Sequence, residues 1–330
     1  MENKKILYSA TKPTGELTIG NYLGAIKNWI KMQDEYDCYF CIANLHAHTI
    51  DLSAEFVREK TMKQFAMFLA CGLDPDKSIM YVQSMVKEHS ELCWLLNCTT
   101  MMGEASRMTQ YKDHVAKGEK GISTALFTYP ILMAADIVLF NTNIVPVGED
   151  QVQHVELARD IVNRFNNRFG ATFVVPKAVV PKVGARIKGL LNPLGKMGKS
   201  GDDMNNIILL EDSDDEIRRK LKRAVTDSLN EIKFDEENQP GVSNLLTIIS
   251  ACEGKTIEQI VDELKGQGYG VLKNRTAEAI IKTVAPIRDK YNYYLTHRDE
   301  LLEIMKKGAN KAEDIAKETL NRAKNNMGLL

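Results

Sequence analysis

Residues 4–21, KKILYSATKPTGELTIGN, contain the segment that decides the fold of this chain. The first seven form a largely apolar run that ends before a Pro-Thr-Gly turn, which predicts a strand. A helix is predicted to begin near Thr18, because apolar side chains recur on one helical face after it, at Leu23, Ile26, Trp29 and Ile30. A helix that begins at the carboxyl end of a parallel strand presents free backbone N–H groups and the positive end of its dipole, and phosphates bind there. The segment therefore predicts either a nucleotide site, with Thr18, Gly20 and Asn21 near the ligand, or only a capped helix after a tight turn.

The alternation of strand and helix continues outward from this segment. Strands are predicted at YFCIANL (39–45), at SIMYVQS (78–84) and at the start of IVPVGEDQ (144–151), and a long helix is predicted over about 53–70. Strands that alternate with helices favour a parallel sheet with right-handed crossovers. The predicted fold class is α/β.

Two other regions read as helical. Residues of about 88–170 predict a helical insertion, interrupted by a polar stretch at 110–123 that suits either a mobile loop over a site or a solvated connection. Residues from about 205 onward predict an all-helical domain. We therefore expect a first domain over 1–204 and a helical domain over 205–330, with the last helix as a candidate to pack back on the first domain.

Composition describes an ordinary globular protein. Of 330 residues, 44% are hydrophobic and 26% are charged, and the formal net charge is −1, so indiscriminate nucleic-acid binding is not expected, although a basic patch can exist in a neutral chain. The sequence has no run long enough for a membrane helix and no signal peptide at MENKKILYSA, which predicts a cytoplasmic protein. Cys38 and Cys41 form a C-x-x-C, but residues three apart on a strand face opposite sides, so they are interpreted as core residues.

A second polar cluster, Lys196-Met-Gly-Lys-Ser200, lies in a glycine-rich stretch. Two lysines three residues apart among small residues suit a loop that closes on a pyrophosphate, where lysine acts as a mobile point charge. The spacing is not that of a P-loop, and no strand leads directly into it. Taken alone, the cluster fits a solvated basic loop better than a binding loop.

Together the two clusters resemble the paired signatures of the class I aminoacyl-tRNA synthetases. Thr18-Ile-Gly-Asn21 resembles the HIGH motif, and KMGKS at 196–200 resembles KMSKS. P-[ST]-G-x-x-T-[IL]-G-N is the form found in the bacterial-type tryptophanyl-tRNA synthetases, and further blocks match that family along the chain, namely ANLHAHT, SRMTQYK, TYPILMAADI, NIVPVGEDQVQH, PKVGARI, AVTDS, PGVSNLL and GYG. The resemblance runs from about residue 5 to the end. It implies a Rossmann-like catalytic domain with a connective insertion and a helical domain that reads the tRNA anticodon.

The resemblance also implies a tryptophan site. Asp136 matches the carboxylate that accepts the indole N–H, and a site built around such an acceptor rejects substrates that lack the donor. The other residues at matching pocket positions are Tyr8, His46, Tyr129, Met133, Val145, Val147 and Gln151. His46 and His48 could instead form a metal pair, but no third ligand is evident, so no metal site is predicted.

The ATP site implied by the resemblance draws on several separate segments. The matching positions are Lys12, Pro13, Thr14, Gly20, Asn21, Gly148, Glu149, Asp150, Ile187, Lys196, Met197, Gly198, Lys199 and Ser200. Gly148, Glu149 and Asp150 match the contact with the ribose, and Ile187 matches the backbone position that reads adenine. Four residues are predicted to be catalytic, namely Thr18, Asn21, Lys196 and Lys199.

The implied reaction has two steps. The tryptophan carboxylate attacks the α-phosphorus of ATP, bound with Mg²⁺ as the substrate complex, and a ribose hydroxyl of the terminal adenosine of tRNA(Trp) then takes the aminoacyl group. Positioning and charge stabilisation should supply catalysis, because the carboxylate is already ionised. The resemblance further implies a homodimer. Basic residues of the helical domain are candidates to contact tRNA or simply form a solvated face, namely Arg218, Arg219, Lys220, Lys222 and Arg223.

The sequence departs from the family pattern at several positions. Lys12 and Ala10 stand where relatives usually have glutamine and glycine, Tyr8 replaces the commoner phenylalanine, and Gly198 replaces a serine. His114 stands where relatives often carry a lysine that faces phosphate, so Lys112 or Lys117 is a candidate for that role.

Three alternatives stay open at this point. A tyrosyl-tRNA synthetase is the nearest, and exchange assays with the two amino acids separate them. A paralogue that has lost aminoacylation and serves as a regulatory or RNA-binding module is supported only by the departures at Lys12 and Gly198. An unrelated nucleotidyltransferase would share the first motif and the ATP chemistry but not the pocket or the tRNA domain.

Overall fold

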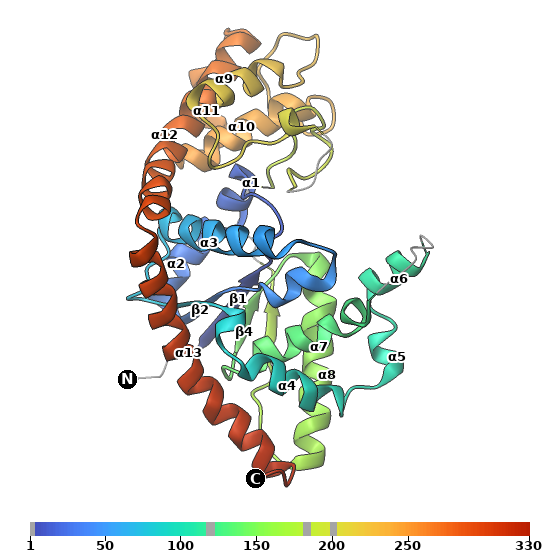
Figure 1. The fold of residues 1–330 in the computed structure, drawn as a ribbon. Coiled ribbons are helices and arrows are strands. Elements are labelled where there is room, and N and C mark those ends of the chain that lie inside the picture. Colours follow the sequence, from blue (N-terminus) through green and yellow to red (C-terminus); the bar gives the residue numbers. More distant parts are fainter. Residues whose placement is uncertain (1–3, 117–122, 181–185, 199–202) are drawn as a thin grey trace.

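The computed structural model describes residues 4–116, 123–180, 186–198 and 203–330. Its centre is a five-stranded sheet made of β1 (Ile6–Thr11), β2 (Asp37–Ile42), β3 (Ile79–Val82), β4 (Ile144–Pro146) and β5 (Lys177–Val179). The strands pair in parallel in the order β3-β2-β1-β4-β5. The α/β prediction is confirmed (Figure 1).

The strand order places a topological switch point between β1 and β4. The chain first moves outward from β1 to β2 and β3, and then returns to the other side of β1 for β4 and β5. In sheets of this kind, ligands bind outside the carboxyl ends of the strands at the switch point. The segments that follow Thr11 and Pro146 are therefore the ones to inspect for a site.

The helices before the insertion follow the predicted pattern. Thr18 is the N-cap of a continuous helical segment built from α1 (Ile19–Asn21), the π-helical η1 (Tyr22–Ile26) and α2 (Lys27–Glu35). Ser53 caps α3 (Ala54–Cys71), which ends at Gly72 in the left-handed conformation. The short helices η2 (Leu45–Thr49) and η3 (Gln83–Met85) follow β2 and β3.

Some strand predictions were wrong at their ends. The second strand stops at Ile42, because Asn44 bonds the Ser84 side chain and the Leu45 N–H donates to the Gln83 side chain instead of joining the ladder. The third strand likewise ends at Val82. The edge strand β5 was not predicted, because three residues are too few to show a period.

The insertion between β3 and β5 is largely helical, as predicted. It contains α4 (Glu88–Asn97), α5 (Met102–Ala105), α6 (Thr109–Ala116), α7 (Thr124–Val138), η4 (Glu149–Gln151) and α8 (Val152–Phe169), with β4 between α7 and η4. The polar stretch expected as a loop begins with α6, and residues 117–122 lie outside the described part of the chain.

After residue 203 the described elements are helices. They are η5 (Met204–Asn206), α9 (Asp214–Arg223), α10 (Pro240–Glu253), α11 (Ile257–Glu263), α12 (Tyr269–Thr296) and α13 (Arg298–Asn326). Figure 1 shows α9, α10 and α11 gathered beyond α3, with α12 leading from them towards the sheet and α13 continuing past the sheet to the C-terminus. α12 contacts α3, α9 and α10, whereas α13 contacts β3 and α4. The division into domains at residue 204 stays a prediction.

The two faces of the sheet lie in different hydrophobic clusters. Cys38, Phe40 and Ile42 of β2 pack with α3 and the C-terminal helices. The alternate residues Tyr39 and Cys41 pack with α4, α7, α8 and α13. The two thiols of the C-x-x-C therefore face opposite sides of the sheet, as strand geometry predicted. In the part of the chain that the structure describes, no helix has the length and apolar character needed to cross a membrane.

Candidate functional site

The turn after β1 begins the candidate site. Lys12 is exposed and Pro13 is buried, and the turn leads into the N-cap at Thr18. The Asn21 N–H donates to Thr18 Oγ1 (3.2 Å), while the backbone N–H and hydroxyl of Thr18 both donate to Asn21 Oδ1 (2.9 and 3.1 Å). Thr18 is fully buried. In this conformation its hydroxyl caps the helix and does not face a ligand, which is the simpler of the two readings that the sequence allowed.

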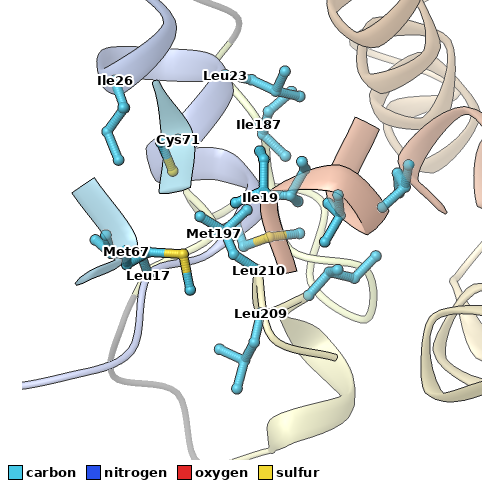
Figure 2. Close-up of a cluster of buried hydrophobic side chains, with 14 of the residues drawn as sticks. Leu17, Ile19, Leu23, Ile26, Met67, Cys71, Ile187, Met197, Leu209 and Leu210 are labelled. Atoms are coloured by element: carbon cyan, nitrogen blue, oxygen red, sulfur yellow. The ribbon is translucent and has the colours of Figure 1, made fainter. Parts of the chain in front are cut away.

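The two motif segments meet at Gly20. A Cβ added there would lie 3.4 Å from Cβ of Met197 and 3.5 Å from Cβ of Ile187. Gly20 therefore packs against the second motif segment, and its expected contact with ATP stays a prediction. Figure 2 shows Ile19, Ile187 and Met197 in one buried cluster.

Backbone bonds hold the second motif segment in that position. The Met197 N–H donates to the Ile187 carbonyl (2.9 Å), and Lys188 and Lys196 form an antiparallel bridge. Lys196 itself is exposed. Lys199 and Ser200 lie outside the described residues, so their predicted contacts with ATP stay predictions.

Gly198 is not required by packing. The nearest atom to a Cβ added there is the Lys196 carbonyl oxygen at 3.9 Å. The serine that relatives carry would fit, so the structure gives no steric reason for this departure.

The third segment lies at the end of β4, on the other side of the switch point. Gly148, Glu149 and Asp150 are exposed there, next to the carboxyl end of β1. A Cβ at Gly148 would lie only 2.7 Å from Asp150 Oδ1, so glycine lets the carboxylate fold back over the turn. Gln151 donates its amide N–H to Asp150 Oδ2 (2.8 Å). Exposed carboxylates at this place suit a ligand with hydroxyl groups, such as a ribose.

Asp136, on α7, is the most enclosed polar group of the site. It is 1% exposed, and three side chains hydrogen-bond to it. His46 Nε2 lies 2.8 Å from Oδ2, while His89 Nδ1 and Gln83 Nε2 both lie 2.7 Å from Oδ1. Asp136 is therefore a satisfied buried carboxylate in this structure, not a bare one.

The environment of Asp136 favours its ionised form. Burial by itself would raise the pKa, because the charged form loses water. The imidazoles of His89 and His46 outweigh that effect through their charges and hydrogen bonds, so the pKa of Asp136 lies below its ordinary value. The site thus holds a buried negative charge with an acceptor oxygen, Oδ2, that has one protein donor.

Apolar side chains surround this carboxylate. Tyr8 and Val145 belong to the cluster around α7, and Met133 and Val147 pack against it half-buried. The Tyr8 ring stacks on Phe140, with centroids 5.9 Å apart. Burial raises the pKa of Tyr8 well above its ordinary value, so the hydroxyl stays protonated. The structure brings the predicted indole-pocket residues together.

Tyr129 lies on the same face of α7, two turns before Asp136. Its hydroxyl is 2.6 Å from Nε2 of His154 on α8, and its ring meets the His46 ring edge-on at 6.2 Å. Burial raises the pKa of Tyr129 to about 12. The Tyr129 phenol and the His154 imidazole therefore meet between His46, which bonds Asp136, and the start of α8.

Sequence reasoning missed three of these groups. Gln83 and His89 come from η3 and α4, and neither had a recognisable pattern of its own. His154 stood at the end of the block NIVPVGEDQVQH without a role. The only available signal for His89 and His154 was an imidazole on an otherwise apolar helical face, which is more often a core residue.

The structure argues against two alternatives raised by the sequence, a metal pair at His46 and His48 and a uniform basic face on α9. His46 turns inward to Asp136 while His48 is exposed, so the pair does not converge on a metal. Lys220 is buried and its Nζ lies 2.6 Å from Asp212 Oδ2, so α9 is not a uniform basic face. The side chain of His114 and residue Lys117 lie outside the described parts, and Lys112 is exposed.

The open cavity near this region is not the Asp136 site. A cavity of about 350 Å³ lies on the other side of the 45–49 turn and is lined by side chains that include His48, Arg58 and Met305. Asp136 does not line it, and Asp136 is enclosed.

Comparison with known proteins agrees with this arrangement. The pattern of the family described as class I tRNA synthetases (W and Y) matches residues 1–285. The tryptophan–tRNA ligase of Clostridium perfringens is 48% identical over 329 residues, which cover 100% of this chain and 99% of that protein. The ligase of Caldanaerobacter subterraneus is 49% identical over 326 residues and covers 99% of both chains.

A solved structure shows the same similarity in three dimensions. The tryptophanyl-tRNA synthetase of Campylobacter jejuni, crystallised in complex with ADP and tryptophan, superimposes with a TM-score of 0.86 at 39% identity. The match covers 98% of this chain and 100% of that one.

The fold, the meeting of the two motifs and the family match define the class. The chain belongs to the class I tRNA synthetases of the W and Y family, which are aminoacyl-tRNA ligases. Within that family, the curated relatives that match it along nearly their whole length are tryptophan–tRNA ligases.

Proposed function

We propose that this chain activates L-tryptophan with ATP and transfers it to the 3′ end of tRNA(Trp). The observation that carries the proposal is the contact between the two motif segments at Gly20 and Met197, beside a switch point that also holds Gly148–Asp150. The buried Asp136 carboxylate adds an acceptor for an indole N–H. The similarity to tryptophan–tRNA ligases over the whole chain supports the same substrate.

The first step forms an acyl phosphate bond. A carboxylate oxygen of tryptophan attacks the α-phosphorus of ATP, the bond from that phosphorus to the bridging oxygen breaks, and pyrophosphate leaves with the electron pair. No general base is needed, because the tryptophan carboxylate is already ionised. In the second step, a ribose hydroxyl of the tRNA attacks the acyl carbon, loses its proton and releases AMP.

The residues that stabilise the first step are those of the turn and the second motif. Lys196 is exposed at the edge of the site, and we assign it with Lys199 to the leaving pyrophosphate, whose negative charge grows as the bond breaks. Gly20, which precedes Asn21 in α1, lies next to Met197. The ATP enters with Mg²⁺ as part of the substrate, and the exposed carboxylates of Glu149 and Asp150 suit its ribose.

Tryptophan selection is assigned to Asp136. Its Oδ2 has one protein donor and can accept a second N–H. Because Asp136 is enclosed, binding must displace a half-buried side chain or break one of the three existing hydrogen bonds. We therefore expect tryptophan binding to be coupled to a local rearrangement of the α7 face.

A homodimer is part of the proposal. Large apolar side chains are exposed on α4 and at the start of α5, where Trp94 is 69%, Met101 is 56% and Met102 is 74% exposed. Exposed apolar patches of this kind favour a protein interface. A second copy is the occupant that the family resemblance implies.

The helical region after residue 204 is proposed to bind tRNA. It lies beyond α3, and α12 joins it to the catalytic part (Figure 1). Exposed Lys222 and Arg223 at the end of α9 are candidates for phosphate contacts. Lys220 is buried and paired with Asp212, so it is not a candidate for phosphate contacts.

The experiment is amino-acid-dependent exchange of labelled pyrophosphate into ATP. We expect exchange with tryptophan that is at least 100-fold faster than with tyrosine at equal concentration, because a site with a buried acceptor for an N–H discriminates strongly. Exchange with tyrosine alone would identify a tyrosine enzyme. Exchange with neither amino acid, at saturating substrates, would favour a module without catalytic activity. Binding of tRNA(Trp) to the protein would then be measured directly.

A further inference from the structure

The ATP site and the indole pocket described above make no use of the hydrogen bond between Tyr129 and His154. His154 is 1% exposed, and burial lowers the pKa of its imidazole, so it is neutral at physiological pH. Its Nε2 meets the Tyr129 hydroxyl at 2.6 Å, while Nδ1 has no partner among the described residues. No other described group therefore fixes the tautomer, and Tyr129 alone decides which ring nitrogen carries the proton.

Tyr129 is placed to meet the amino-acid end of tryptophan. Seven residues separate it from Asp136 on α7, which is about 10 Å along the helix axis on the same face. Tryptophan is an elongated molecule with the indole N–H near one end and the α-ammonium near the other. If the indole N–H binds Asp136, the ammonium lies towards Tyr129 and Gln151.

An ammonium group needs acceptors only. The Gln151 amide N–H already donates to Asp150, which leaves its amide oxygen as an acceptor. The Tyr129 hydroxyl can serve as an acceptor for the ammonium only if its own proton points elsewhere, since it remains protonated. In the Nδ1–H tautomer of a neutral His154, Nε2 lies 2.6 Å from the hydroxyl and can accept that proton.

We infer that His154 is a positioning residue for substrate recognition, because it accepts the Tyr129 hydroxyl proton and so turns the phenol oxygen towards the α-ammonium of tryptophan. This inference rests on the proposed function and deepens it. His154 lies in the first turn of α8, shortly after Gly148–Asp150. The same helix start therefore serves the nucleotide and the amino group of the amino acid. The opposite arrangement, in which Tyr129 donates to the substrate carboxylate, is the competing outcome.

Three ligands separate these possibilities. L-Tryptophan carries both groups, tryptamine carries only the ammonium, and indole-3-propionate carries only the carboxylate. Affinities are measured by calorimetry with wild-type protein and with His154→Phe, which removes the acceptor. We expect tryptophan and tryptamine to bind about 10-fold more weakly to the variant, which is a typical effect of losing a hydrogen bond to a charged group, and indole-3-propionate to bind as before.

Two further variants control for structural damage. His154→Gln places an amide near the position of Nε2 and should restore most of the lost affinity for tryptophan and tryptamine. Tyr81→Phe removes a different buried phenol that bonds a histidine, His89, on the Asp136 side. We expect Tyr81→Phe to change the affinities of all three ligands by the same factor, because all three carry the indole.

The inference is overturned by an equal loss for all three ligands with His154→Phe, by a loss confined to the two ligands with a carboxylate, or by no loss at all. Retained binding of indole-3-propionate shows that the variant is folded. If wild-type protein binds none of the three ligands, the proposed function itself is contradicted, and the inference fails with it. The two failures are therefore distinguishable.

Discussion

Asp136 shows how a single buried charge can be stable in an apolar cluster. Its carboxylate receives hydrogen bonds from His46, His89 and Gln83, which come from three elements that follow β2 and β3. The penalty for burying the charge is offset by these donors, and removing the acceptor would leave them without a partner.

This network predicts a pH dependence of stability. Because the folded pKa of Asp136 lies below its ordinary value of 3.8, its ionised form stabilises the folded state fully above about pH 4, and this contribution is lost as the pH falls through the folded pKa. Asp136→Asn should lower the free energy of unfolding by roughly 3 kcal/mol at neutral pH. The difference from wild type should shrink below pH 4.

Urea unfolding followed by circular dichroism between pH 2.5 and pH 7 measures this effect. Asp160→Asn, on the exposed face of α8, is the matched control and should leave the unfolding midpoint unchanged. A wild-type to Asp136→Asn difference that stayed constant across the whole range would contradict the pKa shift.

α13 depends on one close contact with the sheet. A Cβ placed on Gly308 would lie 1.7 Å from the Met80 carbonyl oxygen, so the helix backbone lies directly on β3. Small residues at Ala309, Ala312 and Ala316 continue the same buried face. The end of the chain is in this way fixed to the catalytic part.

Gly308→Ala should therefore destabilise the protein, although alanine favours helices. The clash is with backbone, which cannot rotate away, and we expect a loss of about 2 kcal/mol. Gly270→Ala in α12, where a Cβ meets nothing within 4 Å, is the matched control and should be neutral or stabilising by up to about 1 kcal/mol. Equal urea midpoints for the two variants would contradict this prediction and show that α13 can shift away from β3 to accommodate the added Cβ.

The exposed apolar patch on α4 and α5 belongs to the assembly. Trp94→Glu places a charge in the proposed interface and should convert a dimer to a monomer in sedimentation velocity at micromolar concentration. Val271→Glu on α12 changes an exposed apolar residue outside the patch and should leave the dimer intact. A monomeric wild-type protein would refute the proposed dimer.

Local patterns alone gave the first strand, the cap at Thr18, the helix at 54–71 and the α/β class, because strand alternation, cap residues and helical periodicity act between near neighbours. Family motifs named Asp136, Tyr129 and the two ATP segments. The end of β2 was misjudged because a side chain from the helix after β3, Gln83 of η3, accepts the N–H of Leu45.

The sequence by itself determined which residue types the chain could bring to a nucleotide and an indole. Only the tertiary structure decided which of them meet. Gln83, His89 and His154 reach the site because parallel crossovers and helix packing bring together segments that are distant in the chain, and Gly20 meets Met197 for the same reason. Such contacts depend on the relative placement of whole elements, which no local pattern encodes.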